Sequence, residues 1–248
     1  MKKVMLVTGA SRGIGAQIAL LAGREGYKVA VNYLNSEEAA REVVKQIHAE
    51  GGEAIAIQAD TTNPQDVRDL FQKVDDQLGT LDVLVNNAGI LKTFLVEDIN
   101  AHNVAEMFNA NVLSVFYCTR EAVLRMSTDK GGRGGSIINM TSVAARLGTM
   151  PGGVAYAATK GAIDAFNLAL SKEVGGQGIR VNAIRPGLIS TEMHNATGGI
   201  AEMQERARAI VPMGRAGTAR EVAEAAIWLA SDSASYVHGS VIDVAGGR

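Results

Sequence analysis

The chain has 248 residues, of which 47% are apolar, and its 24 Lys and Arg against 26 Asp and Glu give a net charge of −2. The basic residues are scattered, so we expect no nucleic-acid partner and favour a small-molecule ligand. One cysteine excludes an internal disulfide, and the four histidines lack the spacing of metal ligands, so no metal is expected. No apolar stretch approaches about 18 residues, so we expect no membrane partner and a cytoplasmic protein.

Short apolar runs alternate with helix-like segments along the chain. The first run ends in a glycine turn and precedes apolar residues with the spacing of a helix. We expect seven strands, at residues 4–7, 29–33, 54–58, 81–85, 137–140, 179–184 and 241–244. We expect helices at residues 14–22, 36–49, 65–78, in one long element through 111–126, around Tyr156, and near 221–230.

Strands joined by helical crossovers predict a parallel sheet with helices on both faces, because the crossovers are right-handed. No linker, repeat or low-complexity tract divides the chain, so we interpret residues 1–248 as a single α/β domain with a doubly wound, Rossmann-type sheet of seven strands. Ligands of such sheets bind beyond the carboxyl ends of the strands. Gly9, Asn87, Ser142 and Pro186 are expected at that edge.

The turn Thr8-Gly-Ala-Ser-Arg-Gly-Ile-Gly15 follows the first strand. Its glycines allow the main chain to approach a pyrophosphate, and the next helix directs free N–H groups at the anion. The pattern alone also fits a plain tight turn, but its place between an apolar strand and an apolar helix favours a dinucleotide. The lack of a following Gly-Lys-Ser/Thr argues against nucleotide hydrolysis. The cofactor-binding residues expected in this turn are Gly9, Ser11, Arg12, Gly13, Ile14 and Gly15.

The end of the second strand commonly distinguishes the two nicotinamide cofactors, since a carboxylate there binds the ribose 2′-hydroxyl of NAD and repels a 2′-phosphate. Asn32 holds that place, beside Tyr33, and Arg12 could pair with a phosphate. We therefore predict NADP(H) as the cofactor. NAD(H) remains the alternative, because Glu37 and Glu38 would weaken an anion site and Arg12 also fits a solvated surface arginine.

Tyr156 and Lys160 stand four residues apart, which places them on one face of a helix. A close ammonium favours the phenolate and lowers the phenol pKa from about 10, making the phenol a useful acid or base. Ser142 follows the apolar strand at 137–140, so its hydroxyl is expected beside Tyr156, where two donors would hold one substrate oxygen. Singly, each residue also fits an ordinary structural place.

Several of these motifs occur in one order along the chain: Thr8-Gly-x-x-x-Gly-x-Gly15, Asn86-Asn-Ala-Gly89, Ser142, Tyr156-x-x-x-Lys160 and Pro186-Gly187. In this combination the chain resembles the short-chain dehydrogenase/reductases from end to end. It is similar to β-ketoacyl-carrier-protein reductases, sugar dehydrogenases and uncharacterised bacterial oxidoreductases. The resemblance implies a seven-stranded parallel sheet, NAD(P)(H) as cofactor and a homotetramer.

The resemblance also implies roles for single residues. It makes Tyr156 the general acid/base, Ser142 the group that orients the substrate oxygen, and Lys160 the residue that holds the nicotinamide ribose and lowers the tyrosine pKa. Asn111 would help connect Lys160 to solvent through water. The remaining implied cofactor contacts are Asp60 and Thr61 near the adenine, Asn87, Ala88 and Gly89 along the cofactor, and Pro186, Gly187, Ile189 and Thr191 near the nicotinamide.

Substrate choice is expected to depend on residues 143–154 and 190–214. The second segment carries Met193, Met203, Met213 and a Gly198-Gly199 hinge, which predicts a mobile lid; a surface helix with core methionines is the alternative. Arg146 could meet a substrate carboxylate or phosphate, although an exposed arginine is commoner.

The predicted activity is hydride transfer between NADP(H) and a carbonyl or secondary-alcohol substrate. The alternative is a catalytically silent NADP(H)-binding sensor or scaffold protein, for which the set Ser142, Tyr156, Lys160 and Asn111 would be unnecessary. The sequence leaves the substrate, the direction of the reaction and its stereochemistry open.

Overall fold

Seven parallel strands form the central sheet of the computed structural model, which describes the backbone of residues 2–191 and 199–248 and the side chains within these ranges other than 199–201. The strands lie in the order β3-β2-β1-β4-β5-β6-β9, and every neighbouring pair is parallel, which confirms the predicted doubly wound sheet. Their bounds are β1 Val4–Val7, β2 Lys28–Tyr33, β3 Glu53–Gln58, β4 Val83–Asn86, β5 Gly135–Met140, β6 Ile179–Pro186 and β9 Val241–Val244.

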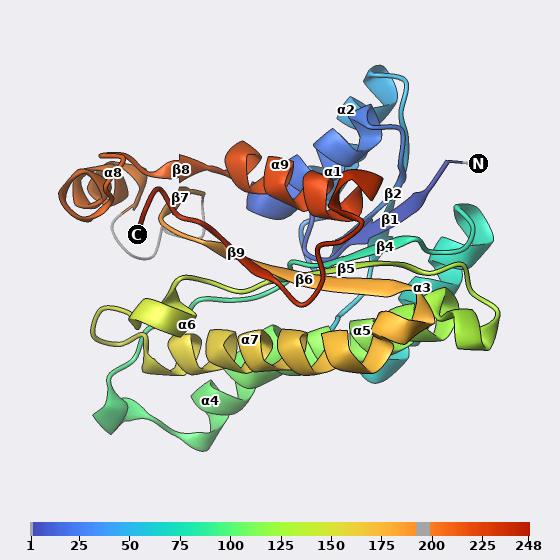
Figure 1. The fold of residues 1–248 in the computed structure, drawn as a ribbon. Coiled ribbons are helices and arrows are strands. Elements are labelled where there is room, and N and C mark those ends of the chain that lie inside the picture. The colour runs from blue at the N-terminus through green and yellow to red at the C-terminus, as the bar shows by residue number, and fades with distance from the viewer. Residues whose placement is uncertain (1, 192–198) are drawn as a thin grey trace.

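Helices cover both faces of this sheet (Figure 1). One face packs against α1, α2 and α9, and the other against α3, α5 and α7, each through its own apolar cluster. The helices are α1 Gly13–Arg24, α2 Glu37–Ala49, α3 Pro64–Gln77, α4 Ala101–Phe108, α5 Ser114–Met126, α6 Ala144–Leu147, α7 Val154–Val174, α8 Gly199–Ile210 and α9 Ala219–Ala230. Within the described part of the chain, no helix combines the length and apolarity needed to cross a bilayer.

Local sequence explains where several elements begin. All four residues of β1 are buried, as expected of a strand covered on both faces. Asn63 accepts hydrogen bonds from the main-chain N–H groups of the first turn of α3, and Pro64 follows at a position where its missing N–H costs nothing. Thr218 and Glu221 form a reciprocal capping box at the start of α9.

The single long helix predicted through residues 111–126 is wrong at its N-terminal end. A π-helical turn, Asn109–Leu113, separates α4 from α5, and Asn111 lies in this turn. The turn contains one extra residue. Its Asn111 side chain bonds both the N–H and the oxygen of Ile90, a tertiary contact that favours the bulge. Apolar periodicity does not reveal such an insertion. The helix α6 and a second, two-stranded sheet of β7 Ile189–Ser190 and β8 Gly217–Thr218 were not predicted either.

The segment predicted as a lid, residues 190–214, is described only in part. Met193 and Gly198 lie outside the described residues. Met203, on α8, is 4% exposed in a small core with Leu188, Ala207, Val211 and Ala216, as the alternative of a helix with a core methionine expects. Met213 is exposed.

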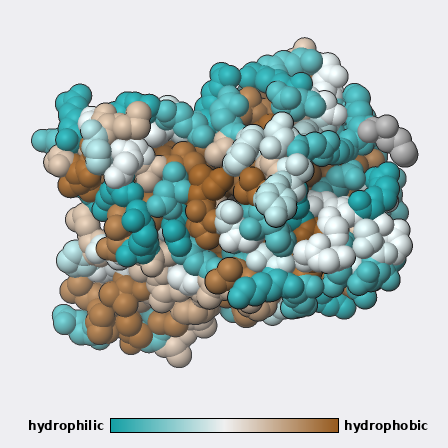
Figure 2. Space-filling model, in the orientation of Figure 1, coloured by the Kyte–Doolittle hydropathy of each residue, from teal (hydrophilic) through white to brown (hydrophobic). Residues whose placement is uncertain are grey.

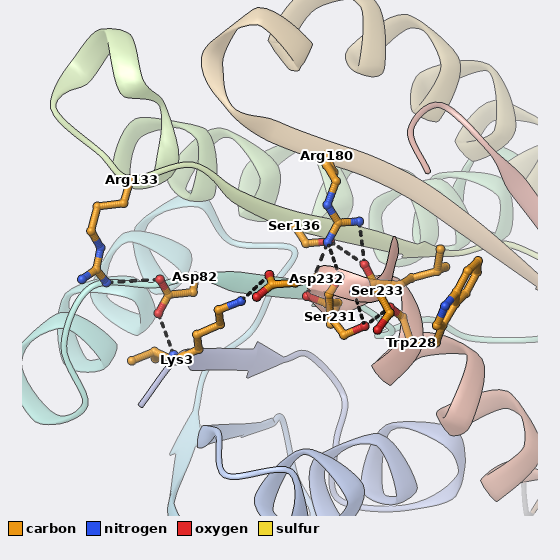
Figure 3. A network of polar contacts seen from close by, with 12 residues as sticks. Lys3, Asp82, Arg133, Ser136, Arg180, Trp228, Ser231, Asp232 and Ser233 are labelled. Carbon is orange, nitrogen blue, oxygen red and sulfur yellow. Dashed lines mark hydrogen bonds and ion pairs between the residues drawn. The ribbon is translucent and has the colours of Figure 1, made fainter. Parts of the chain in front are cut away.

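A polar network closes the edge of the sheet where the strands begin (Figure 3). Lys3 pairs with Asp232 at 2.7 Å, and Arg133 pairs with Asp82 at 3.1 Å. Arg180, half-buried on β6, donates to the main-chain oxygens of Leu229, Ala230 and Ser231, at the C-terminal end of α9. The guanidinium therefore satisfies carbonyls that the helix leaves without partners.

We expect Arg180→Met to lower the free energy of unfolding by about 1.5–3 kcal/mol, because the variant leaves these carbonyls without their charged donor. Arg220→Met is the matched control, since Arg220 pairs only with Glu224 on the exposed face of α9 and should cost at most about 0.5 kcal/mol. Urea unfolding of both variants measures the difference. Equal losses would show that Arg180 does not support this helix end.

Candidate active site

Two glycines of the first turn are required by packing between loops. Gly9 has φ +60°, and a Cβ there would lie 2.9 Å from the Cα of Ala88. A Cβ on Gly15 would lie 2.5 Å from the side-chain nitrogen of Asn87 and 2.7 Å from the Gly9 oxygen. Gly9 and Gly15 thus allow the turn after β1 to lie directly against the loop after β4.

Thr8 joins the same two loops by hydrogen bonds. Its hydroxyl accepts from the main-chain N–H groups of Asn87 and Ala88, both at 3.0 Å. The Asn87 amide donates in return to the main-chain oxygens of Thr8 and Gly9, at 2.9 and 3.0 Å. Residues 87–89 are therefore fixed beside the glycine turn, next to the start of α1, where we expect the cofactor. The sequence motif contains Thr8, but its role as this link was missed.

The start of α1 suits an anionic ligand. Arg12 precedes the helix in extended conformation, and its own side chain does not cap the first turn, whose main-chain N–H groups point out of the helix end. Gly13 has φ +58°, and a Cβ there would meet only Thr191, at 3.7 Å. These features fit the pyrophosphate of a dinucleotide.

Asn32 lies beneath the glycine turn. Its side chain is buried, accepts from the Gly9 N–H at 3.2 Å, and donates to the main-chain oxygens of Ile57 at 3.3 Å and Ala59 at 3.1 Å. These hydrogen bonds direct the Asn32 amide to the main chain beneath the glycine turn. The predicted contact of Asn32 with the cofactor stays a prediction.

Polar groups from neighbouring elements lie around the end of β2. Arg12, exposed, donates through Nη2 to the hydroxyl of Ser36 at 3.0 Å, just before α2. Tyr33, the last residue of β2, is buried. After the neighbouring strand β3, a carboxylate oxygen of Asp60 accepts from the N–H and the hydroxyl of Thr62, both at 2.8 Å. Thr61, between these two residues in the sequence, is buried. These groups form the outer end of the expected cofactor site.

Lys160 fastens α7 to the carboxyl end of β5. Its Nζ donates to the main-chain oxygen of Met140 at 2.9 Å, and the Thr141 hydroxyl donates to the main-chain oxygen of Lys160 at 3.0 Å. Tyr156 lies one turn earlier on α7, with its ring centroid 5.7 Å from the ammonium. Ser142 follows β5 by two residues and hydrogen-bonds the Tyr156 side chain. The tyrosine, the serine and the lysine thus come together as predicted.

The electrostatics of the pair differ from the prediction. Burial lowers the pKa of Lys160 to about 8, while the negative charge of Asp164 opposes that change. Burial raises the pKa of Tyr156, and the hydrogen bond from Ser142 only partly offsets this. The neighbouring ammonium, bonded to Met140, does not outweigh desolvation of the phenolate. In this structure the phenol is therefore held in its protonated form, ready to donate.

Asn111 connects the loop after β4 to α7. Its side-chain oxygen accepts from the Ile90 N–H at 2.7 Å, and its amide donates to the Ile90 oxygen at 2.9 Å and to the Thr159 hydroxyl at 3.2 Å. Thr159 donates in turn to the main-chain oxygen of Tyr156 at 2.7 Å. The residue thus supports the catalytic helix directly; its predicted water-mediated link to Lys160 stays a prediction.

A pocket of about 200 Å³ opens at this edge of the sheet. It brings together Tyr156, Ser142 and Lys160 with seven residues predicted to contact the cofactor, Ile14, Asn87, Gly89, Pro186, Gly187, Ile189 and Thr191. The other predicted cofactor residues lie outside its wall, in the glycine turn and after β2 and β3. These are Gly9, Ser11, Arg12, Gly13, Gly15, Asn32, Tyr33, Asp60, Thr61 and Ala88.

Sequence reasoning missed several residues of the pocket wall. Leu91 and Thr93, in the loop after β4, and Arg206 and Arg248 all line it. Arg206 falls within the segment 190–214 that we expected to govern substrate choice, but it was not singled out, and the only sequence signal for Arg248 was its basic character. Arg146, which we considered as an anion contact, instead pairs with Asp243 at 3.0 Å and lies outside the wall.

Comparisons with known proteins agree with this geometry. The family described as enoyl-(acyl carrier protein) reductase matches residues 9–248. The uncharacterized oxidoreductase YgfF of Escherichia coli K12 is 50% identical over 246 residues, which are 99% of both chains. The 3-oxoacyl-[acyl-carrier-protein] reductase FabG of Staphylococcus aureus Mu50 is 40% identical over 100% of this chain and 98% of its own.

A solved structure shares the fold throughout. The short chain dehydrogenase of Burkholderia cenocepacia J2315, in complex with NADP, matches with a TM-score of 0.90 and 34% identity over 99% of this chain and 97% of its own. The chain belongs to the short-chain dehydrogenase/reductase family of oxidoreductases.

The low pKa of Lys160 predicts a particular dependence of stability on pH. Between about pH 8 and 10.5 the folded protein has released this proton while the unfolded chain still holds it, so rising pH favours the folded state. Lys160→Met cannot titrate there. We expect the unfolding free energy of the wild type, minus that of Lys160→Met, to increase across this interval in urea titrations. A constant difference would contradict a pKa of about 8.

Proposed function

We propose that the protein transfers a hydride between NADP(H) and a carbonyl or secondary-alcohol substrate, with Tyr156 as general acid/base. The observation that carries this proposal is the meeting of Tyr156, Ser142 and Lys160 in one pocket whose wall continues into the loops beside the glycine turn. When bound, the nicotinamide supplies or accepts the hydride.

The side chains of the pocket suit the charge that develops on the substrate oxygen. The Tyr156 and Ser142 hydroxyls are hydrogen-bonded to each other, and both can donate to one oxygen between them. Negative charge grows on that oxygen during reduction, so fixed donors stabilise the transition state more than the ground state. Tyr156, kept protonated by burial, gives its proton to the oxygen, and the ammonium of Lys160 stabilises the resulting phenolate. Oxidation of an alcohol follows the same path in reverse.

Tyr156→Phe tests this role. Loss of a general acid commonly lowers turnover by about 10²- to 10⁴-fold. We expect that loss for an accepted ketone, with the Kd for NADPH within about twofold of the wild type. Tyr236→Phe is the matched control, because Tyr236 is fully exposed far from the pocket and should keep full activity. Unchanged turnover in Tyr156→Phe would reject the assignment, and NADPH binding without turnover of any ketone or alcohol would favour a sensor or scaffold protein.

The preference for NADP(H) is supported by Arg12 and Ser36 at the end of β2. Arg12 brings a positive charge to this place, and the related Burkholderia structure contains NADP. The acids Glu37 and Glu38 follow in α2, but Glu37 pairs with Arg41 at 2.7 Å. A charge-assisted bond from Arg12 to a 2′-phosphate would add affinity for NADPH alone.

We therefore expect Arg12→Ala to lower kcat/KM with NADPH by about 10- to 100-fold and to leave kcat/KM with NADH nearly unchanged. Arg68→Ala on the exposed face of α3 serves as the control, since Arg68 only contacts Gln65 of its own helix. Steady-state kinetics with both cofactors give the ratio. A wild-type protein that prefers NADH would overturn this assignment.

We also propose a homotetramer. Support comes from apolar side chains that remain exposed at one end of the molecule. Leu95, Val96 and Ile99 lie on the surface around η1, Val96–Asp98, and Figure 2 shows apolar atoms gathered in this region. Phe116 on α5 and Leu168 on α7 are exposed as well, and covering such side chains favours association.

A further inference from the structure

Two arginines from distant parts of the chain meet in the wall of the catalytic pocket. Arg206 lies on α8, and Arg248 follows β9. Figure 1 places α8 beside the C-terminus, at the edge where the strands end. Both side chains are partly buried and line the same pocket as Tyr156 and Ser142.

The positive charge of this wall is not balanced within the described residues. Its described lining contains Lys160, Arg206 and Arg248 but no Asp or Glu. Burial, and then the nearby charge of Arg206, lower the pKa of Arg248. Two cations held close together in a partly dehydrated place raise the free energy of the protein unless an anion joins them.

Neighbouring arginines at the same end of the molecule do have acidic partners. Arg185 pairs with Asp164 at 2.7 Å and with Asp243 at 3.4 Å, and Arg215 pairs with Glu221 at 2.6 Å. In the described part of the chain, neither Arg206 nor Arg248 forms a side-chain ion pair. Among the residues that the structure describes, carboxylates thus pair with these arginines outside the pocket and not with the two that line it.

Hydrogen bonds join the chain segments that carry the two arginines. The Arg248 oxygen accepts from Nη2 of Arg146 at 2.9 Å, and Arg146 is itself paired with Asp243. Just before Arg248, the Gly246 oxygen accepts from the Met213 N–H at 3.1 Å, which joins the C-terminal segment to the chain that leaves α8. Both arginines thus extend from joined segments of the chain to one pocket wall, where two guanidinium groups can bind the same anion.

We propose that Arg206 and Arg248 form an anion site in the substrate pocket, so that the substrate carries a carboxylate or phosphate besides its carbonyl or hydroxyl group. This inference rests on the proposed function and names the class of its substrate. Guanidinium groups match the paired oxygens of both anions, while Tyr156 and Ser142 hold the reacting oxygen. The two arginines determine which substrate binds. The hydride and proton transfers proceed as described under the proposed function.

Matched pairs of ketones test the proposal with NADPH as the reductant. The pairs are 4-oxopentanoate with its methyl ester, 3-oxobutanoate with its methyl ester, and dihydroxyacetone phosphate with dihydroxyacetone. We expect kcat/KM for the anionic member of at least one pair to exceed that of its neutral partner by about 10- to 100-fold. Whether the keto acids or the keto phosphate show this excess distinguishes carboxylate from phosphate.

Arg206→Gln and Arg248→Gln should each abolish this excess, while kcat/KM for the neutral partner and the Kd for NADPH stay within about twofold. Arg208→Gln, on an exposed position of the same helix, should retain it. Equal use of anionic and neutral ketones by the wild type would overturn the anion site. So would a parallel loss for both members in the variants, or a weaker Kd for NADPH, which would assign the arginines to the cofactor phosphates.

Calorimetric binding of the same anions to the NADP⁺-loaded protein separates this inference from the proposed function. Anion binding that disappears in Arg206→Gln, without turnover of any ketone, would support the site and reject the activity. Turnover of the neutral ketones, with no binding of any anion, would support the activity and reject the site.

Discussion

The position of α7, the helix that carries Tyr156, depends on one buried contact, the hydrogen bond from the Lys160 ammonium to the Met140 oxygen at the end of β5. The Thr141 hydroxyl completes the contact by bonding the main chain of Lys160. Together these bonds fix α7 against the sheet at one height and rotation, which brings Tyr156 to Ser142. Burial of the Lys160 amine disfavours its charged form, and for this reason the pKa of Lys160 is lowered.

A series of side chains with alternating charge extends from this contact. Asp164, one turn beyond Lys160, lies close enough to oppose the fall of the lysine pKa. Its other ion partner is Arg185, which also reaches Asp243, and Asp243 pairs with Arg146. The series runs from Lys160 to the segment that holds Arg248. The same residues therefore support the Tyr156 helix and the outer wall of the pocket.

Features encoded in short stretches of sequence were predictable, and those that depend on tertiary contacts were not. Apolar runs gave the seven strands, and the Tyr156-x-x-x-Lys160 spacing gave one face of a helix. By contrast, the direction of the Asn32 side chain depends on its contacts with Gly9 and with β3, which are distant in sequence. The presence of Arg206 and Arg248 in one pocket wall requires α8 and the C-terminal segment to lie side by side, which no local pattern contains. The raised pKa of Tyr156 likewise reflects enclosure by the whole pocket.

The π-helical turn at Asn109–Leu113 limits how the length of this region can vary. The turn accommodates one extra residue, so deleting a residue here would restore a continuous α-helix and leave α4 and α5 in nearly the same orientation. The deletion would instead remove the turn in which Asn111 bonds the Ile90 main chain. The length of this turn is therefore tied to one polar contact, that of the Asn111 side chain with the Ile90 main chain.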